Sequence, residues 1–129
     1  MSKKALVIAA AVVPMIAISA IAQQSPIKRT PLQNNEFPPG FNTVTAIVEV
    51  SPGNCAGRHT HPGLETSYVM DGAILLKVAG QPDRTLKAGE SLSIPANTPH
   101  DACTIPGETF KILAVYVVEK GKPLATPAP

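Results

Sequence analysis

The sequence predicts an all-β fold, and three observations support this prediction. From Phe41 onward, short runs rich in β-branched residues recur, and Gly, Pro, Asn or Asp residues separate them. Beyond the first 22 residues, no stretch keeps a helical period for more than a few residues. The remaining chain, just over a hundred residues, is long enough for one core. Short strands of this kind form a β-sandwich or a closed barrel, in which closure removes exposed strand edges.

The first 22 residues have the layout of a secretory signal peptide. Lys3 and Lys4 precede the apolar run ALVIAAAVVPMIAISAIA, which ends in a small-x-small pattern before polar residues. The alternative is an uncleaved membrane anchor, although Pro14 interrupts a run that is near the minimum length of a span. The signal peptide predicts a secreted or periplasmic protein that is free of the membrane after cleavage.

The charge pattern argues against a nucleic-acid partner. The net charge of +2 comes entirely from Lys3 and Lys4, so the mature chain is close to neutral. Its remaining Lys and Arg residues are scattered, which indicates neither a nucleic-acid footprint nor a polybasic membrane patch.

The predicted elements follow in order. Residues 23–40, rich in Pro, Asn and Gln, are expected to form an extended N-terminal arm or loop, and the folded domain spans residues 41–119. Its expected strands are FNTVTAIVEV, TSYVM, AILLKVAG, RTLKAG, ESLSIPA, HDACTI and TFKILAVYVVEK. Asp71-Gly72 predicts a two-residue hairpin, and Gly80–Asp83 and Pro106-Gly107 predict further turns. Residues 120–129 are expected to be a flexible C-terminal tail.

Two cysteines, Cys55 and Cys103, remain to be assigned. An oxidising compartment would permit a disulfide. Sequence alone does not pair them, because the Cα separation and the Cβ directions decide whether a bridge forms. Two buried thiols that pack as small apolar residues are the alternative.

Two of the three histidines lie in the stretch GNCAGRHTHPGLETSYVMDG. His59 and His61 are two residues apart and therefore share one face of a strand. After a turn at Pro62-Gly63, Glu65 opens the next strand, and an antiparallel neighbour about 5 Å away can direct its side chain to the same point. A fourth ligand must come from elsewhere, and His100 is the remaining histidine. Neutral imidazole and carboxylate groups suit Fe, Mn, Ni, Cu or Zn.

These stretches resemble the two motifs of the cupin superfamily. The first motif, G(x)5HxH(x)3E(x)6G, is matched at every fixed position, namely Gly53, His59, His61, Glu65 and Gly72. The second, G(x)5PxG(x)2H(x)3N, is matched at Gly89, Pro95 and His100. Asn97 stands where the motif has a Gly, and Thr104 stands where it has an Asn. Asn tolerates the left-handed backbone that a Gly would supply, so the first departure is mild.

The resemblance implies a single-domain, small jelly-roll β-barrel of the monocupin type, similar to quercetin dioxygenase-like members in site layout. It implies one divalent transition metal ion, bound by His59, His61, Glu65 and His100. Family members often form homodimers, sometimes by exchange of N-terminal strands, so a homodimer is possible here.

The ligand set uses all three histidines and Glu65, and few other titratable groups are expected inside the barrel. Chemistry centred on the ion is therefore favoured over general acid–base catalysis. We expect a metal-dependent, dioxygenase-like oxidoreductase that acts on a small chelating substrate, an enediol, diketone or thiol, with Glu65 accepting a proton. Two alternatives stay open: a metal-dependent small-molecule binding module without turnover, and a metal that staples a small core.

Three aromatic residues, Tyr68, Phe110 and Tyr116, are expected in the core. The pocket is expected to be lined by aliphatic residues and Met70. The chain has no Trp, so a large pocket that stacks a flavonoid is not indicated.

Overall fold

The computed structural model describes residues 26–129, which form strands, turns and loops. The strands are β1 (Ile27–Glu36), β2 (Phe41–Val50), β3 (His59–Thr60), β4 (Gly63–Val78), β5 (Arg84–Lys87), β6 (Ser91–Ile94), β7 (His100–Thr104), β8 (Phe110–Glu119) and β9 (Thr126–Pro127). The all-β prediction is confirmed. Within residues 26–129, no helix has the length and apolar character needed to cross a membrane. The expected signal peptide, residues 1–22, lies outside the described residues.

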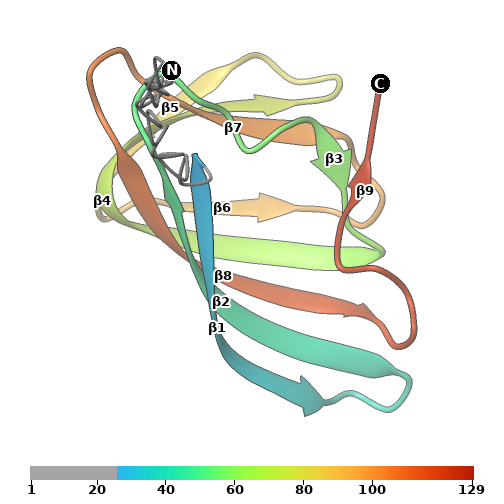
Figure 1. Cartoon of the computed structure of the whole chain (residues 1–129). Coiled ribbons are helices and arrows are strands. Elements are labelled where there is room, and N and C mark those ends of the chain that lie inside the picture. The colour runs from blue at the N-terminus through green and yellow to red at the C-terminus, as the bar shows by residue number, and fades with distance from the viewer. Residues whose placement is uncertain (1–25) are drawn as a thin grey trace, which may run out of the picture.

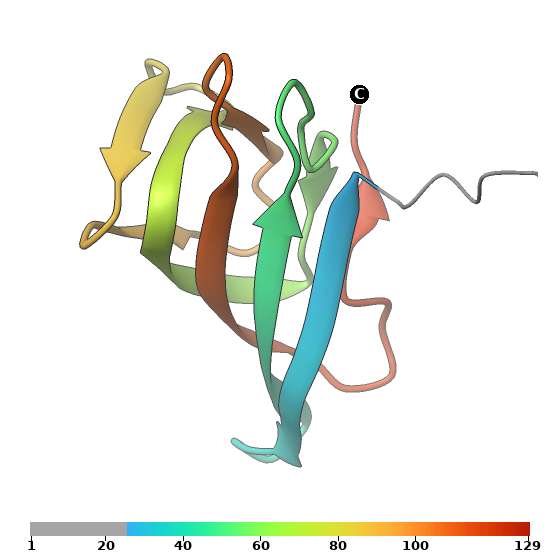
Figure 2. The ribbon, with the colours of Figure 1, turned by 60° about the vertical axis from the view of Figure 1, so that its left-hand side comes forward.

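The strands form two layers that curl around one core (Figure 1). The first layer contains β1, β2, β8, the first half of β4 and β6. The second contains the other half of β4 together with β5, β7, β3 and β9. All of these pairs are antiparallel. Figure 2 shows how β4 curves across the molecule, so that one strand belongs to both layers.

The hairpin predicted at Asp71-Gly72 is wrong, because β4 continues through these residues. Its register against β8 shifts between Val69 and Asp71, which is the signature of a β-bulge. Gly72 has a φ of 71°, and a Cβ at this position would lie 2.0 Å from the carbonyl oxygen of Thr109. The Asp-Gly pair therefore bends β4 from one layer into the other.

Alternate residues of the long strands fill the core. In β8 every second side chain is buried, starting with Phe110. The largest side chains that are fully buried are Phe110, Ile74, Ile94, Val50 and Val69. Burial of one such side chain stabilises the fold by about 1.5–3 kcal/mol. Both layers contribute to this set, so the core holds the two layers together.

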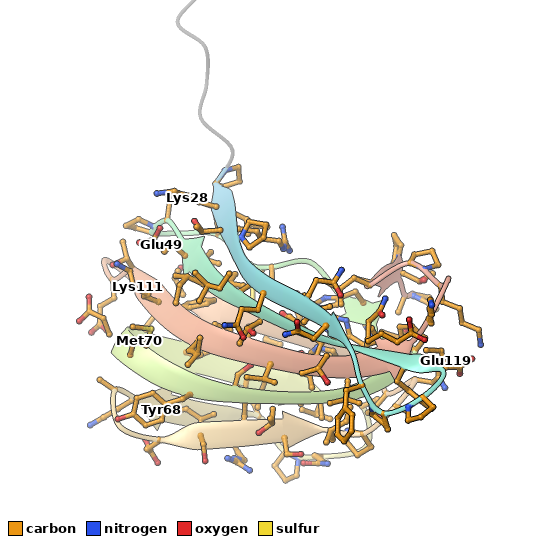
Figure 3. All side chains as sticks on the ribbon, turned by 90° about the horizontal axis from the view of Figure 1, so that it is seen from below. Lys28, Glu49, Tyr68, Met70, Lys111 and Glu119 are labelled. Atoms are coloured by element: carbon orange, nitrogen blue, oxygen red, sulfur yellow. A yellow bond between two sulfur atoms is a disulfide. The ribbon has the colours of Figure 1, made fainter. Side chains whose placement is uncertain are left out.

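The outer face of β4 carries two large side chains that were expected inside. Tyr68 is 49% exposed and Met70 is 46% exposed, and both project from the outer surface in Figure 3. The alternation of a strand explains this, because Tyr68 lies three residues after the buried Glu65 and faces the opposite side. The predictions for these two residues are wrong, whereas Phe110 and Tyr116 are in the core as expected.

Most of the expected N-terminal arm forms the edge strand β1. It pairs with β2 from Ile27 opposite Val50 to Glu36 opposite Asn42, with a register shift after Pro31. Proline is tolerated in an edge strand because its missing N–H need not face a partner. The arm is therefore extended, and hydrogen bonds attach it to the sheet.

The tail at residues 120–129, predicted to be flexible, is instead attached to the domain. Its strand β9 pairs with β3, with Pro127 opposite His59. Leu124 packs against the core, and the N–H of Ala128 donates to the carbonyl of Arg58 at 3.0 Å. A proline-rich composition suggested disorder, but prolines are compatible with a short strand at a sheet edge.

Cys55 and Cys103 form a disulfide, which settles the pairing that the sequence left open. The same two residues form an isolated antiparallel bridge. The loop before β3 is thereby joined to β7, next to the strand ends that carry the histidines.

Candidate metal centre

Four side chains from both layers meet at one point. His59 lies on β3, His61 follows that strand, His100 begins β7, and Glu65 lies on β4. Their donor atoms are all within 4.8 Å of one another. His61, Glu65 and His100 are almost completely buried. The structure thus brings together all four residues that the sequence selected, and the cluster is able to hold a metal ion.

Glu65 reaches the cluster from the opposite layer. The prediction that it lies on a strand next to the histidine strand is wrong. β3 pairs with β7, which places His59 directly opposite His100. Glu65 lies in the other layer, opposite Tyr116 of β8. The ion site therefore bridges the two layers at the opening between them.

The chain passes from the layer of the histidines to the layer of Glu65 at the turn of Pro62-Gly63. Gly63 begins β4 directly against β8, opposite Val118. A Cβ on Gly63 would lie 1.9 Å from the carbonyl oxygen of Val117, so any side chain would push the two strands apart. This close approach allows His61 and Glu65 to face each other across the layers.

Each histidine of the cluster has its Nδ1 bonded to a main-chain carbonyl. The bonds run from His59 to Gly57 at 2.5 Å, from His61 to Leu124 at 2.6 Å and from His100 to Thr98 at 2.9 Å. A carbonyl oxygen only accepts, so each Nδ1 carries the hydrogen of these bonds. In a neutral ring the Nε2 lone pair is then free to bind a metal.

The spacing of the donor atoms fits a divalent ion. The Nε2 atoms of His59 and His61 are 3.1 Å apart. Glu65 Oε2 lies 3.0 Å from His61 Nε2 and 3.1 Å from His100 Nε2. Donors about 2.1 Å from an ion, at right angles to each other, would be roughly 3 Å apart. Imidazole and carboxylate donors suit Fe, Mn, Ni, Cu and Zn.

In the metal-free cluster the Glu65 carboxyl is held in its ionised form. Burial raises the pKa of Glu65. Hydrogen bonds from His100, His61 and Ser67 lower it by more, so the carboxyl ionises well below its usual range. Burial lowers the pKa of His100, but its bond with Glu65 prevails and raises it. Burial also lowers the pKa of His59, which favours the neutral ligand form.

Ser67 is a site residue that the sequence analysis missed. Its hydroxyl donates to Glu65 Oε1 at 2.8 Å, and the side chain is buried. The bond holds one carboxylate oxygen while the other faces the histidines. The signal was available, because residues two apart on a strand share a face, so a strand that directs Glu65 inward also directs Ser67 inward.

A cavity of about 50 Å³ opens beside the cluster, with room for only a few water molecules. Tyr116 lines it, and its ring centroid is 4.7 Å from that of His61. Burial, followed by the charge of Glu65, raises the pKa of the Tyr116 hydroxyl. Most of the remaining wall is apolar, formed by Val48, Leu76, Leu92, Ala102, Phe110 and Ile112.

The two departures from the second motif have structural explanations. Asn97 has a φ of 57°, which is the left-handed conformation expected where a glycine would otherwise stand. Its N–H donates to the carbonyl of His61 at 2.8 Å. The Thr104 hydroxyl accepts hydrogen bonds from the N–H groups of Gly53 and Asn54 at 2.9 and 3.2 Å. The neighbouring Cys103 is in the disulfide with Cys55, so the nearby group of Cys55, Asp101 and Cys103 offers no free thiolate to a metal.

Comparison with known proteins identifies the family of this chain. Residues 46–116 match the model of the cupin domain. This match covers more than half of the chain. The protein belongs to the cupin family. The matched region of this cupin contains all four cluster residues. No curated protein matches its sequence.

Solved structures share the fold of this cupin. A cupin-like protein from Thermotoga maritima superposes with a TM-score of 0.67 at 25% identity, over 79% of this chain and 75% of that one. The polyketide cyclase RemF from Streptomyces resistomycificus gives 0.66 at 25% identity, over 81% of this chain and 72% of the cyclase. The DMSP lyase DddQ from Ruegeria pomeroyi gives 0.62 at 21% identity. This cupin covers 43% of that lyase, less than half its length.

Proposed function

We propose that this cupin is an exported, metal-dependent enzyme with dioxygenase-like chemistry that acts on a small chelating substrate, an enediol, diketone or thiol. The observation that carries the proposal is the convergence of three histidine Nε2 atoms and the Glu65 carboxylate beside an open cavity. A bound redox-active ion would supply Lewis acidity and the activation of O₂, which is the oxidant. Four protein donors leave room for further ligands on an ion that prefers six.

Glu65 is the proposed catalytic residue, because it can take up a proton. It is the one carboxylate among the described residues that line the cavity. Ser67 holds Oε1 while Oε2 faces the histidines. When an enediol or thiol chelates the ion, it must lose a proton. Glu65 is placed to accept that proton within the cluster.

The cavity supports a small substrate. Its volume of about 50 Å³ is well below the several hundred Å³ typical of pockets for drug-sized ligands. Its walls are mostly apolar, which strengthens the electrostatic interactions of the cluster. The absence of Trp from the chain agrees with the lack of a large stacking surface.

The test is O₂ uptake by protein loaded with Fe, Mn, Ni, Cu or Zn, using 2,4-pentanedione, dihydroxyfumarate and cysteine as probes. At least one loaded form should consume O₂ faster than the same concentration of free ion. His61→Ala should abolish the excess, whereas Thr60→Ala, which changes the residue between the two histidines, should retain it. Equal uptake by the wild type and His61→Ala would contradict the proposal.

A binding module without turnover is the second candidate. This candidate is favoured because the cavity offers few groups for proton transfer. The ionisable residues that line it are the histidines, Glu65, Tyr116 and Arg29. A ligand that binds only the folded state raises the melting temperature by mass action. A probe that raises the melting temperature of the metal-loaded protein without O₂ uptake or product would select this candidate.

A metal that serves only as a structural staple would stabilise the fold, yet no probe would add to that stabilisation.

We also propose that the protein is exported and that it forms a homodimer. The layout of residues 1–22 and the Cys55–Cys103 disulfide support a secreted or periplasmic location. N-terminal sequencing of the protein from its native compartment should begin at Gln23. The exposed edge strand β1 supports a homodimer through strand pairing, and sedimentation measures the oligomeric state directly.

A further inference from the structure

Arg29 is a charged residue of the cavity that the metal centre does not use. It lies on β1 opposite Val48 of β2, and Val48 is a buried core residue. Paired residues of neighbouring strands point to the same face, so Arg29 is on the inner face of β1 and lines the cavity, while the residue as a whole remains exposed. Within residues 26–129, its side chain forms no ion pair or hydrogen bond.

The neighbouring cation, Lys28, has a different environment. Its Nζ lies 3.4 Å from Glu49, which also binds Lys111 at 2.8 Å. Figure 3 shows these three side chains near one another on the outer surface. Successive residues of a strand point to opposite faces. β1 thus places one cation in an outer ion-pair network and the next one, without such a partner, at the cavity.

The charges that line the cavity favour an anionic ligand. Glu65 is held by His61, His100 and Ser67, so it does not neutralise Arg29. A divalent ion in the cluster would add two positive charges and leave the lining net positive. Arg29 and Tyr116 both line this cavity.

We propose that the substrate carries a carboxylate in addition to its chelating atoms, and that Arg29 is the residue that selects it. This inference rests on the proposed function of the cluster. The planar guanidinium can bind both oxygens of a carboxylate. The Tyr116 hydroxyl, which has no hydrogen-bond partner in the described part of the chain, can donate to the same group. The substrate is then a small chelating acid that spans from the cluster to β1.

The test compares probes that share one chelating group. Acetohydroxamate chelates a divalent ion and is otherwise neutral, whereas malonomonohydroxamate and succinomonohydroxamate add a carboxylate at two distances. The full-length protein is loaded with Co(II), and its visible spectrum gives the affinity for each probe. At least one acid should bind about tenfold or more tightly than acetohydroxamate, the range for hydrogen bonds to charged groups.

The variants assign this preference to Arg29. Arg29→Gln should remove the preference for the acid and leave the affinity for acetohydroxamate within about twofold of the wild type. Lys28→Gln removes the same charge from the adjacent residue on the outer face, and it should keep the preference. Arg29→Lys should keep part of it. Thermal melts verify that each variant is folded.

The outcomes separate this inference from the proposed function. If acetohydroxamate binds but neither acid is preferred, or if Arg29→Gln keeps the preference, the role of Arg29 is refuted and the chelating function stands. An equal loss in Lys28→Gln would also refute it, because the effect would then reflect overall charge. If Co(II) does not bind, or no hydroxamate changes its spectrum, both proposals fail together.

Discussion

The imidazole of His61 donates its Nδ1 hydrogen to the backbone carbonyl of Leu124, with 2.6 Å between the two atoms. One partner belongs to the metal cluster and the other to the C-terminal segment, 63 residues further along the chain. The segment also pairs with β3 through β9. The orientation of the His61 imidazole therefore depends on a segment whose composition suggested disorder.

Removal of residues 124–129 should weaken metal binding. Loss of a partner that orients a metal-bound histidine typically costs about 10–100-fold in affinity. Competition with a chromophoric chelator measures the affinity for Zn(II). Leu124→Ala is the matched control, because it removes the packed side chain and keeps the carbonyl. Affinities within twofold for the truncated protein and Leu124→Ala would contradict a role for the carbonyl.

Ser67→Ala should lower metal affinity by about tenfold, since it releases one oxygen of Glu65 from its 2.8 Å hydrogen bond. The carboxylate could then rotate away from the histidines. Thr66→Ala alters the adjacent residue on the exposed face and should leave the affinity unchanged. An equal effect of both substitutions would indicate a general disturbance of β4 and count against the specific role of Ser67.

The metal-free protein should become less stable as the pH falls below about 4.5. The folded pKa of Glu65 is lower than its usual value of 4.5. The stability that Glu65 contributes is therefore present above that value and is lost as the pH falls toward the folded pKa. Urea unfolding between pH 3 and pH 7 measures this dependence, and the slope should be shallower in Glu65→Gln. An identical slope in that variant would show that other groups control acid unfolding.

Metal binding should also weaken as the solution becomes more acidic. The pKa of His100 is raised by its bond with Glu65, so the ring retains a proton that the ion must displace. Zn(II) affinity measured from pH 5 to pH 8 should rise with pH and level off above the raised pKa. A flat profile would mean that binding releases no proton from the cluster.

Reduction of the Cys55–Cys103 disulfide should lower the free energy of unfolding. The bridge closes a loop with a sequence separation of 48 residues, and chain entropy predicts a stabilisation of about 4 kcal/mol for a loop of that size. Urea unfolding with and without dithiothreitol measures the change. The Cys55→Ala, Cys103→Ala double variant should match the reduced protein, and reductant should not affect it. A reduced protein as stable as the oxidised one would contradict this prediction.

The strands and the ligand set could be predicted because their signals are local. Alternation and turn residues mark strands such as Phe41–Val50 and Phe110–Glu119. The spacing of His59, His61 and Glu65 fits the family motif. These features depend on residues close together in sequence, where side-chain periodicity and turn chemistry decide the structure.

The features that were missed depend on contacts between distant segments. Asp71-Gly72 has the composition of a hairpin turn, but the close approach of Thr109 makes it a bend within β4. Glu65 was placed beside the histidine strand because the turn at Pro62-Gly63 was expected to join neighbouring strands. Pairing with β8 moved it to the other layer. The C-terminal tail pairs with β3 through backbone hydrogen bonds, which side-chain composition does not report.

The three groups that fix the imidazole rings are all main-chain oxygens, at residues 57, 98 and 124. Mutation cannot remove such an oxygen while the peptide path is kept, so these hydrogen bonds require no particular side chain at the three positions. A column-by-column comparison of related sequences would accordingly not reveal these bonds. Their contribution would become visible only through deletions, insertions or proline substitutions that redirect the backbone.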